Sequence, residues 1–162
     1  MGYTHYWDYD TTSDPHERAA RLVLVIDVAK KIIELAAKRG IALAGGDGTS
    51  APELDGKIVL NGAAPEAYET FAFEPLSVRS YRRGRGYGFC KTGFVAIRQY
   101  DVVVCAILAC IDHVRLADVR SDGRYNDWEA GVALAREAAK LVAPGLVWAG
   151  LDAPRALRMK EE

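Results

Sequence analysis

Residues 14–39 constrain the fold more than any other segment, because their apolar side chains recur at the spacing of one helix face. Ser13 is expected to cap this helix, with Pro15 in its first turn. At the other end, Gly40 is typical of the residue that terminates a helix. The pattern predicts one long helix that packs by a single face, whose apolar positions are Leu22, Val25 or Ile26, Ala29, Ile32 or Ile33, and Ala36.

Shorter segments predict a small sheet and a buried element. Strand-forming residues are concentrated in segments 2–7, 57–60 and 68–74. Residues 102–117 indicate a buried helix that begins at Asp101. Their many Val and Ile residues would also suit a buried strand, and periodicity does not separate the two.

A third helix is expected to be capped by Asn126, with Glu129 in the capping-box position and Pro144 at its end. Its core positions are Trp128, Val132, Ala135, Ala139 and Val142. The predicted fold is a single α+β domain over residues 1–162, with about three helices packed on a small mixed or antiparallel sheet. Residues 152–162 are expected to form a polar C-terminal tail that is frayed or peripheral.

Composition narrows the class of protein. Of the 162 residues, 50% are hydrophobic and 27% are charged, which is typical of one globular domain. The net charge of −1 argues against a general nucleic-acid coat, which carries a basic excess.

Cysteine usage and hydropathy indicate the compartment. Cys90, Cys105 and Cys110 are odd in number and contain no C-x-x-C pair, so neither a disulfide framework nor a zinc site is predicted. Residues 1–10 do not resemble a signal peptide, and the longest apolar run, 102–111, is too short to span a bilayer. We therefore expect a reduced, soluble, cytoplasmic protein with no membrane partner.

The main functional signal is segment 75–100, which contains no acidic residue. Arginine forks bind phosphate or carboxylate, and aromatic rings stack on planar bases. The segment therefore predicts an anionic, aromatic partner. Its basic and aromatic members are Arg79, Tyr81, Arg82, Arg83, Arg85, Tyr87, Phe89, Lys91, Phe94, Arg98 and Tyr100.

Two other interpretations of this segment stay open. It could pair with the acidic amino end of the chain, or it could be a solvated loop whose charges only keep it in water. The acidic residues before the first basic one are Asp8, Asp10, Asp14 and Glu17.

Glycines divide the centre of the segment, and Gly84, Gly86 and Gly88 predict a flexible loop there. A phosphate-binding P-loop needs glycine directly before its lysine, but Cys90 stands before Lys91. A flexible basic loop that closes over an anion is the better interpretation.

The chain has three histidines that could serve as functional groups. If the first strand alternates, His5 shares a face with Tyr3 and Trp7, where it could act as an acid, a base or a ligand. A histidine among aromatic residues is also common as a satisfied packing residue. His16 and His113 have no partner at metal-binding spacing.

Asp122, Asp127 and Glu129 form a compact acidic group near the start of the third helix. These carboxylates could bind a divalent cation or accept hydrogen bonds from a sugar. Ordinary turn and capping chemistry would also explain them.

Several short motifs are spread over most of the chain. They are Gly-Tyr-Thr-His-Tyr-Trp at 2–7, Asn61-Gly62, Phe-Cys-Lys-Thr at 89–92, Tyr100-Asp101, Ser-Asp-Gly at 121–123, and Asp127-Trp128. Together they resemble a family of small phage and prophage proteins. In that family's pattern, Phe-Cys-Lys-Thr is followed closely by Ala-Arg-Lys-Pro-Tyr-Asp, whereas here residues 93–99 separate Thr92 from Tyr100 and the proline is absent. The resemblance implies a phage context with recurring polar, aromatic and basic positions, and it implies no reaction.

The preferred hypothesis is a binding protein for a small anionic, nucleotide-like ligand, which in a phage could sequester a host signalling nucleotide. Phosphate would meet the basic residues, a base would stack on aromatic rings, and Asp122 would accept hydrogen bonds from ribose or base donors. No cofactor is expected. The predicted ligand-binding residues are Tyr3, His5, Trp7, Arg82, Arg83, Arg85, Tyr87, Lys91, Thr92 and Asp122.

Two alternatives remain. The first is a metal-assisted phosphoesterase that uses His5 or Lys91 with Asp122 and Asp127. The second is an interaction module that docks onto a host protein by its basic loop. The sequence leaves open whether the chain forms a homo-oligomer.

Overall fold

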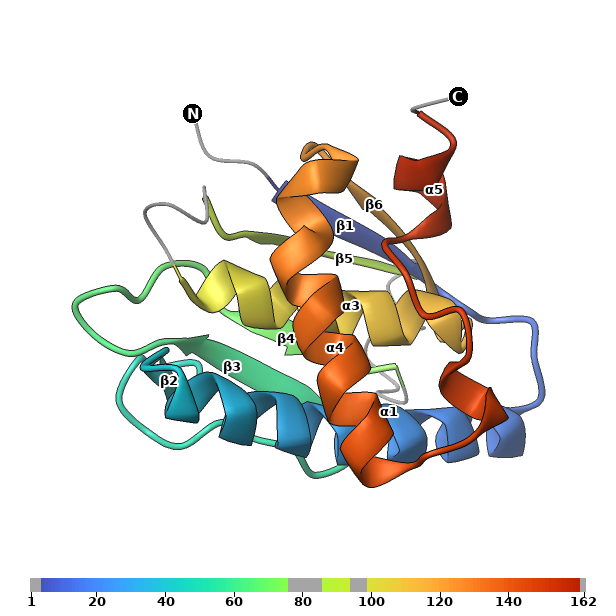
Figure 1. Ribbon diagram of the computed structural model, residues 1–162, viewed down its shortest axis with the longest axis horizontal. Coiled ribbons are helices and arrows are strands. Elements are labelled where there is room, and N and C mark those ends of the chain that lie inside the picture. The colour runs from blue at the N-terminus through green and yellow to red at the C-terminus, as the bar shows by residue number, and fades with distance from the viewer. Residues whose placement is uncertain (1–3, 76–85, 94–98, 161–162) are drawn as a thin grey trace.

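Two antiparallel sheets and three long helices make up an α+β fold in the computed structural model, which describes residues 4–75, 86–93 and 99–160 (Figure 1). This confirms the predicted fold class, with two small sheets in place of one. Sheet A has the strand order β5–β1–β6, and sheet B has the order β2–β3–β4. The elements are β1 (Thr4–Tyr9), α1 (Pro15–Lys38), β2 (Leu43–Ala44), β3 (Ile58–Gly62), β4 (Phe71–Phe73), β5 (Tyr87–Lys91), α3 (Tyr100–His113), β6 (Ala117–Ser121), α4 (Glu129–Val142) and α5 (Arg155–Arg158).

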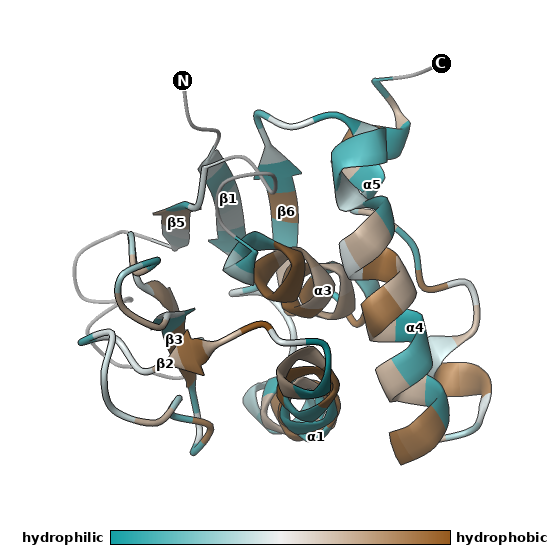
Figure 2. Cartoon of the chain, turned by 60° about the vertical axis from the view of Figure 1, so that its left-hand side comes forward, coloured by the Kyte–Doolittle hydropathy of each residue, from teal (hydrophilic) through white to brown (hydrophobic). Residues whose placement is uncertain are grey.

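Helix α3 lies at the centre of the molecule. It runs between sheet A and α1, with α4 on one side and sheet B on the other (Figure 2). Every residue from Val103 to Ile111 is buried, so this apolar segment is a helix that lies inside the core. The structure shows that this segment is a helix, whose backbone groups pair within the segment while other elements cover it.

The long helix α1 has the predicted extent but a different cap. Asp14, and not Ser13, accepts hydrogen bonds from the backbone N–H groups of His16 (2.8 Å) and Glu17 (3.3 Å). Gly40 has φ +80°, a left-handed conformation that suits glycine at the end of a helix.

The register of sheet A separates its side chains into two faces. His5 pairs with Cys90 on one side and Ser121 on the other, and all three are buried. Tyr6 pairs with Phe89 and Arg120, whose side chains are exposed. We call the buried side, which packs on α3, the inner face and the opposite side the outer face.

The sequence-based expectations missed both outer strands of sheet A. Residues 86 and 88 were expected in a flexible loop, but Gly88 lies inside β5 opposite Trp7. A Cβ on Gly88 would come within 2.4 Å of the Trp7 indole, so the glycine makes room for the ring. Strand β6 occupies residues that were expected in the end of the helix and in a turn.

The carboxyl-terminal third also departs from expectation in detail. The predicted cap at Asn126 and capping box at Glu129 were wrong. A 3-10 turn (Tyr125–Trp128) precedes α4, and its capping-box residue is Asp127, whose carboxylate accepts the Arg124 N–H at 2.7 Å. Val142 is 37% exposed, so it lies outside the core stripe, whereas the other predicted positions of α4 are buried. The tail is not wholly peripheral, since Leu157 of α5 is buried.

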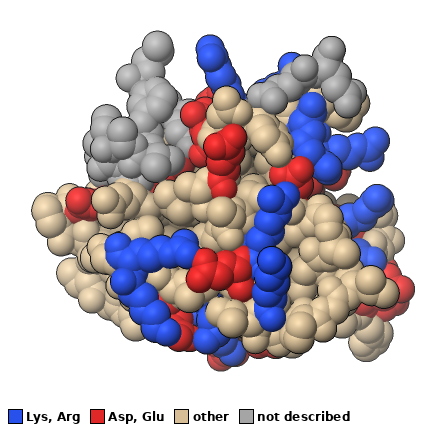
Figure 3. Space-filling view, viewed as in Figure 1, with Lys and Arg blue, Asp and Glu red and all other residues tan. Residues whose placement is uncertain are grey.

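Charges on the surface are mixed in sign. Over α1 and α4, basic and acidic side chains lie next to one another on the face shown in Figure 3. Among the pairs of this surface are Lys31 and Lys38 with Glu34, and Arg39 with Glu137. Hydrogen bonds and charges from the two lysines lower the pKa of Glu34 to about 2. No helix in the described part of the chain is long and apolar enough to cross a bilayer.

Candidate functional site

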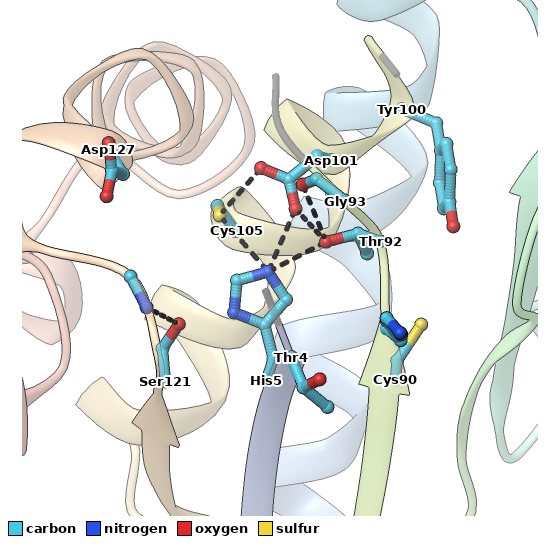
Figure 4. A network of polar contacts seen from close by, with 12 residues as sticks. Thr4, His5, Cys90, Thr92, Gly93, Tyr100, Asp101, Cys105, Ser121 and Asp127 are labelled. Carbon is cyan, nitrogen blue, oxygen red and sulfur yellow. Dashed lines mark hydrogen bonds and ion pairs between the residues drawn. The ribbon is translucent and has the colours of Figure 1, made fainter. Parts of the chain in front are cut away.

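A polar cluster lies inside the core, where the start of β1 meets the end of β5 and the start of α3 (Figure 4). His5 Nε2 lies 2.9 Å from Asp101 Oδ1 and 3.3 Å from Thr92 Oγ1. Cys105 Sγ lies 3.8 Å from His5 Nε2 and 3.6 Å from Asp101 Oδ2. Thr92 Oγ1 also donates to Asp101 Oδ1. We call these four residues the buried cluster.

Local structure explains how the buried cluster forms. Asp101 lies in the first turn of α3, where the helix dipole favours a carboxylate. Cys105 follows four residues later and therefore lies on the same side of the helix. His5 points from the inner face of β1 towards both, and Thr92 follows directly after β5.

All four side chains of the buried cluster are fully enclosed. Burying polar groups is costly unless they are hydrogen-bonded, and Asp101 meets this need by accepting from Thr92 and Cys105 and by contacting His5. The arrangement is not a nucleophilic triad, because Cys105 and Asp101 approach the same ring nitrogen of His5. A triad needs the nucleophile and the carboxylate on different nitrogens.

Residues of most of the motifs named above surround the buried cluster. Trp128 packs edge-on against the His5 ring, with ring centroids 5.1 Å apart. Ser121 pairs with His5 across β1 and β6, and Tyr100 donates its hydroxyl to Glu69 O. Motifs far apart in the sequence therefore meet in one region of the core.

The outer face of sheet A carries a second set of side chains. Tyr87 and Phe89 are 47% and 55% exposed, and their rings stack with centroids 6.4 Å apart and planes 23° apart. Tyr6 lies beside Phe89 on the neighbouring strand. We call these three rings the aromatic row.

Charged groups flank the aromatic row at the start of β1. Thr4 pairs with Lys91 on one side, and on the other side its N–H donates to Asp122 Oδ2 at 3.3 Å. Asp122 Oδ2 also accepts from the Tyr6 hydroxyl at 3.3 Å. The first strand, Lys91 and Asp122 therefore converge in space.

The structure divides the ten predicted ligand-binding residues. His5, Trp7 and Thr92 are buried on the inner side of sheet A, where Trp7 packs against Phe71 and Phe73. Tyr87, Lys91 and Asp122 lie on the outer face. Tyr3, Arg82, Arg83 and Arg85 lie outside the described residues.

The remaining sequence candidates have ordinary structural partners. Asp127 acts in capping, which was the alternative interpretation of the acidic group. The His113 ring contacts Val147 O at 2.7 Å and stacks on Trp148. Of the acidic residues near the amino end, Asp8 pairs with Arg120 and Asp10 with Arg21, so both bind basic residues from outside segment 75–100.

A polar hollow of about 470 Å³ lies at the other end of sheet A, where Asp10 and Arg21 line it. Burial raises the pKa of Asp10, but hydrogen bonds from Ser13 and Thr12 outweigh this effect and hold it well below its ordinary value. Three carboxylates, of Asp8, Asp10 and Asp118, line the hollow against two guanidinium groups, of Arg21 and Arg115, which makes it a poor anion site.

Sequence reasoning missed Asp101 and Cys105 as functional candidates. The available signal was their spacing of four residues, which places two ligand-type side chains on one side of a helix. It was hidden because Cys105 lies in an apolar run, where cysteine is usually a small hydrophobe. That interpretation fits Cys110, whose burial raises its thiol pKa well above the ordinary value.

Comparisons with models of protein families, with curated proteins and with solved structures found no match to this chain.

Proposed function

We propose that the protein binds a small anionic, nucleotide-like ligand on the outer face of sheet A. The observation that carries the proposal is the exposed, stacked pair of Tyr87 and Phe89 beside Lys91. Exposed rings on a sheet are stacking surfaces for bases, and each stacked base contributes about 1–3 kcal/mol. Soluble proteins seldom place two large rings side by side in solvent without a use.

The charged neighbours of the aromatic row have complementary roles. Lys91 would meet phosphate, and Asp122 would accept hydrogen bonds from ribose hydroxyls or base amino groups. Asp122 is suited to this role because its side chain is exposed and its two bonds, both 3.3 Å long, are weak. Arg82, Arg83 and Arg85 precede the strand in the sequence, and on that basis we propose them as further phosphate contacts.

One of the aromatic roles expected from the sequence changes in this proposal. Trp7 is 1% exposed and belongs to the core, so the stacking role passes to Phe89 and Tyr6. The phosphoesterase alternative loses its His5 version, because sheet A separates His5 on its inner face from Asp122 on its outer face. Its Lys91 version stays open, because Lys91 and Asp122 both flank the start of β1.

The phage resemblance supports a biological setting for such binding. A small protein that holds a nucleotide without changing it could sequester a host signalling nucleotide and so act against host defence. This step rests on the resemblance.

Calorimetric titration with a panel of mono-, di- and cyclic nucleotides tests the proposal. We expect at least one to bind, and Phe89→Ala to weaken its binding about 10-fold through loss of stacking. Leu146→Ala is the matched control, because Leu146 is 91% exposed and lies beyond α4, away from sheet A. Lys91→Ala should also weaken binding, whereas Lys30→Ala on the exposed side of α1 should not.

The titration also distinguishes nucleotide binding from the interaction-module alternative, because exposed rings could equally contact a host protein. If no nucleotide of the panel gives heat or a thermal shift with folded protein, nucleotide binding is refuted. If binding occurs but Phe89→Ala and Leu146→Ala behave alike, the ligand lies elsewhere and the outer face is not its site.

A further inference from the structure

We propose that the buried cluster is a metal site, in which His5, Asp101 and Cys105 are the ligands of a zinc-type divalent ion. The ligand atoms of these residues all lie within 4.8 Å of one another. Imidazole nitrogen, carboxylate oxygen and cysteine sulfur are the donors that zinc prefers in proteins. The site is separate from the aromatic row, because it lies on the inner side of sheet A.

Two of the three donor spacings are close to those on one face of a tetrahedron, and the third, from His5 Nε2 to Asp101 Oδ1, is shorter at 2.9 Å. Atoms bound to a tetrahedral zinc at its usual bond lengths are about 3.3–3.6 Å apart. The two distances from Cys105 Sγ, 3.8 Å to His5 Nε2 and 3.6 Å to Asp101 Oδ2, are close to these values. Small rotations of side chains that already point at one another would place all three donors around an ion.

Charge balance also favours a divalent ion at this place. Cys105 as a thiolate and Asp101 as a carboxylate carry two negative charges, and His5 binds as a neutral ring. With a divalent cation, the buried complex has no net charge, which avoids the cost of an uncompensated ion in the core. Binding would release the thiol proton of Cys105 to solvent, with the His5 proton held on Nδ1.

Neighbouring residues supply the outer shell of the site. Thr92 donates its hydroxyl to Asp101 Oδ1 and thereby orients the carboxylate. Trp128 packs against the imidazole ring and shields it. Because all four side chains of the buried cluster are enclosed, the ion would act structurally and join β1, the end of β5 and α3.

The competing explanation is a polar network that needs no ion. Asp101 accepts from Thr92 and Cys105 and contacts His5, which already satisfies the carboxylate. The two explanations differ in metal content and in the state of one thiol, so they can be separated by measurement.

The experiment uses protein produced in minimal medium supplemented with Zn²⁺ or with Co²⁺ and purified without chelator. We expect about one metal ion per chain by elemental analysis. The cobalt form should show a thiolate-to-metal charge-transfer band in the near ultraviolet. Cys105→Ser should lower that band at least about 10-fold. Cys110→Ser is the matched control, since Cys110 is buried in the same helix, and it should keep the band.

The proposal is overturned if the folded wild-type protein from both media carries less than about 0.1 ion per chain, because a structural site is filled during folding. It is also overturned if Cys110→Ser loses the band and Cys105→Ser keeps it. If Cys105→Ser fails to fold, the wild-type band compared with those of Cys90→Ser and Cys110→Ser decides, because a band that either control removes does not arise at Cys105.

Discussion

The inner and outer faces of sheet A belong to the same three strands, but one face is buried against α3 and the other is exposed to solvent. On the inner face, His5 and Trp7 are buried, and their neighbours Ser121 and Cys90 complete a closed surface against α3. On the outer face, Tyr87 and Phe89 present their rings to solvent. Because side chains alternate along a strand, neighbouring residues in one motif belong to different environments.

This difference teaches how the short motifs should be interpreted. In Phe-Cys-Lys-Thr, Phe89 and Lys91 face outwards, whereas Cys90 and Thr92 face the core. A substitution in the first pair should affect binding, and one in the second pair should affect stability. The predictions that follow test this division, beginning with the largest expected effect.

Replacing Asp101 by alanine should destabilise the protein by about 3–5 kcal/mol, because the buried donors of Thr92 and Cys105 and the His5 ring lose their common partner. This is a large part of the total stability of a domain. Asp118→Ala on the outer face of β6 is the matched control and should change stability by less than about 0.5 kcal/mol. Urea unfolding measures both, and similar losses in the two variants would contradict the division.

Replacing Gly88 by alanine should cost about 1–3 kcal/mol, because the added methyl group meets the Trp7 indole at 2.4 Å. The ring is wedged against Phe71 and Phe73 and has little room to retreat. Gly86→Ala is the control from the same segment, because its nearest neighbour would be Thr11 Cγ2 at an ordinary 3.8 Å. The midpoints of thermal unfolding of the two variants should therefore differ. Equal midpoints would show that packing of the Trp7 indole does not require glycine at position 88.

Elements with a clear hydrophobic period were predictable from the sequence. Helix α1 followed from its one apolar face, and its end followed from Gly40. The segment that forms α3 was predicted to be buried, and the structure confirms this. Whether it is a helix or a strand could not be predicted, because its apolar pattern fits both. The α+β class was therefore within reach, whereas the division into two sheets was not.

Strands β5 and β6 were hidden by their local composition. Gly88 suggested a loop, because the reason for the glycine is the Trp7 ring on another strand. The buried cluster was hidden for a related reason, since His5 and Asp101 are 96 residues apart in the chain. Contacts between residues far apart in the chain do not change the local periodicity of either segment. The convergence of Lys91 and Asp122 on the first strand was the one long-range contact that the sequence suggested as a test.

The smallest expected change in stability comes from the aromatic row. Phe89→Ser should lower the free energy of unfolding by about 1 kcal/mol, because the ring is 55% exposed and loses its stacking on Tyr87 and the buried part of its area. The same variant should lose nucleotide binding, so stability and binding would separate at one residue. Cys90→Ser, one position along and fully buried, should show the reverse behaviour. If Phe89→Ser instead costs more than about 3 kcal/mol in urea unfolding, as truncation of a fully buried aromatic side chain does, the outer face is a second core and not a binding surface.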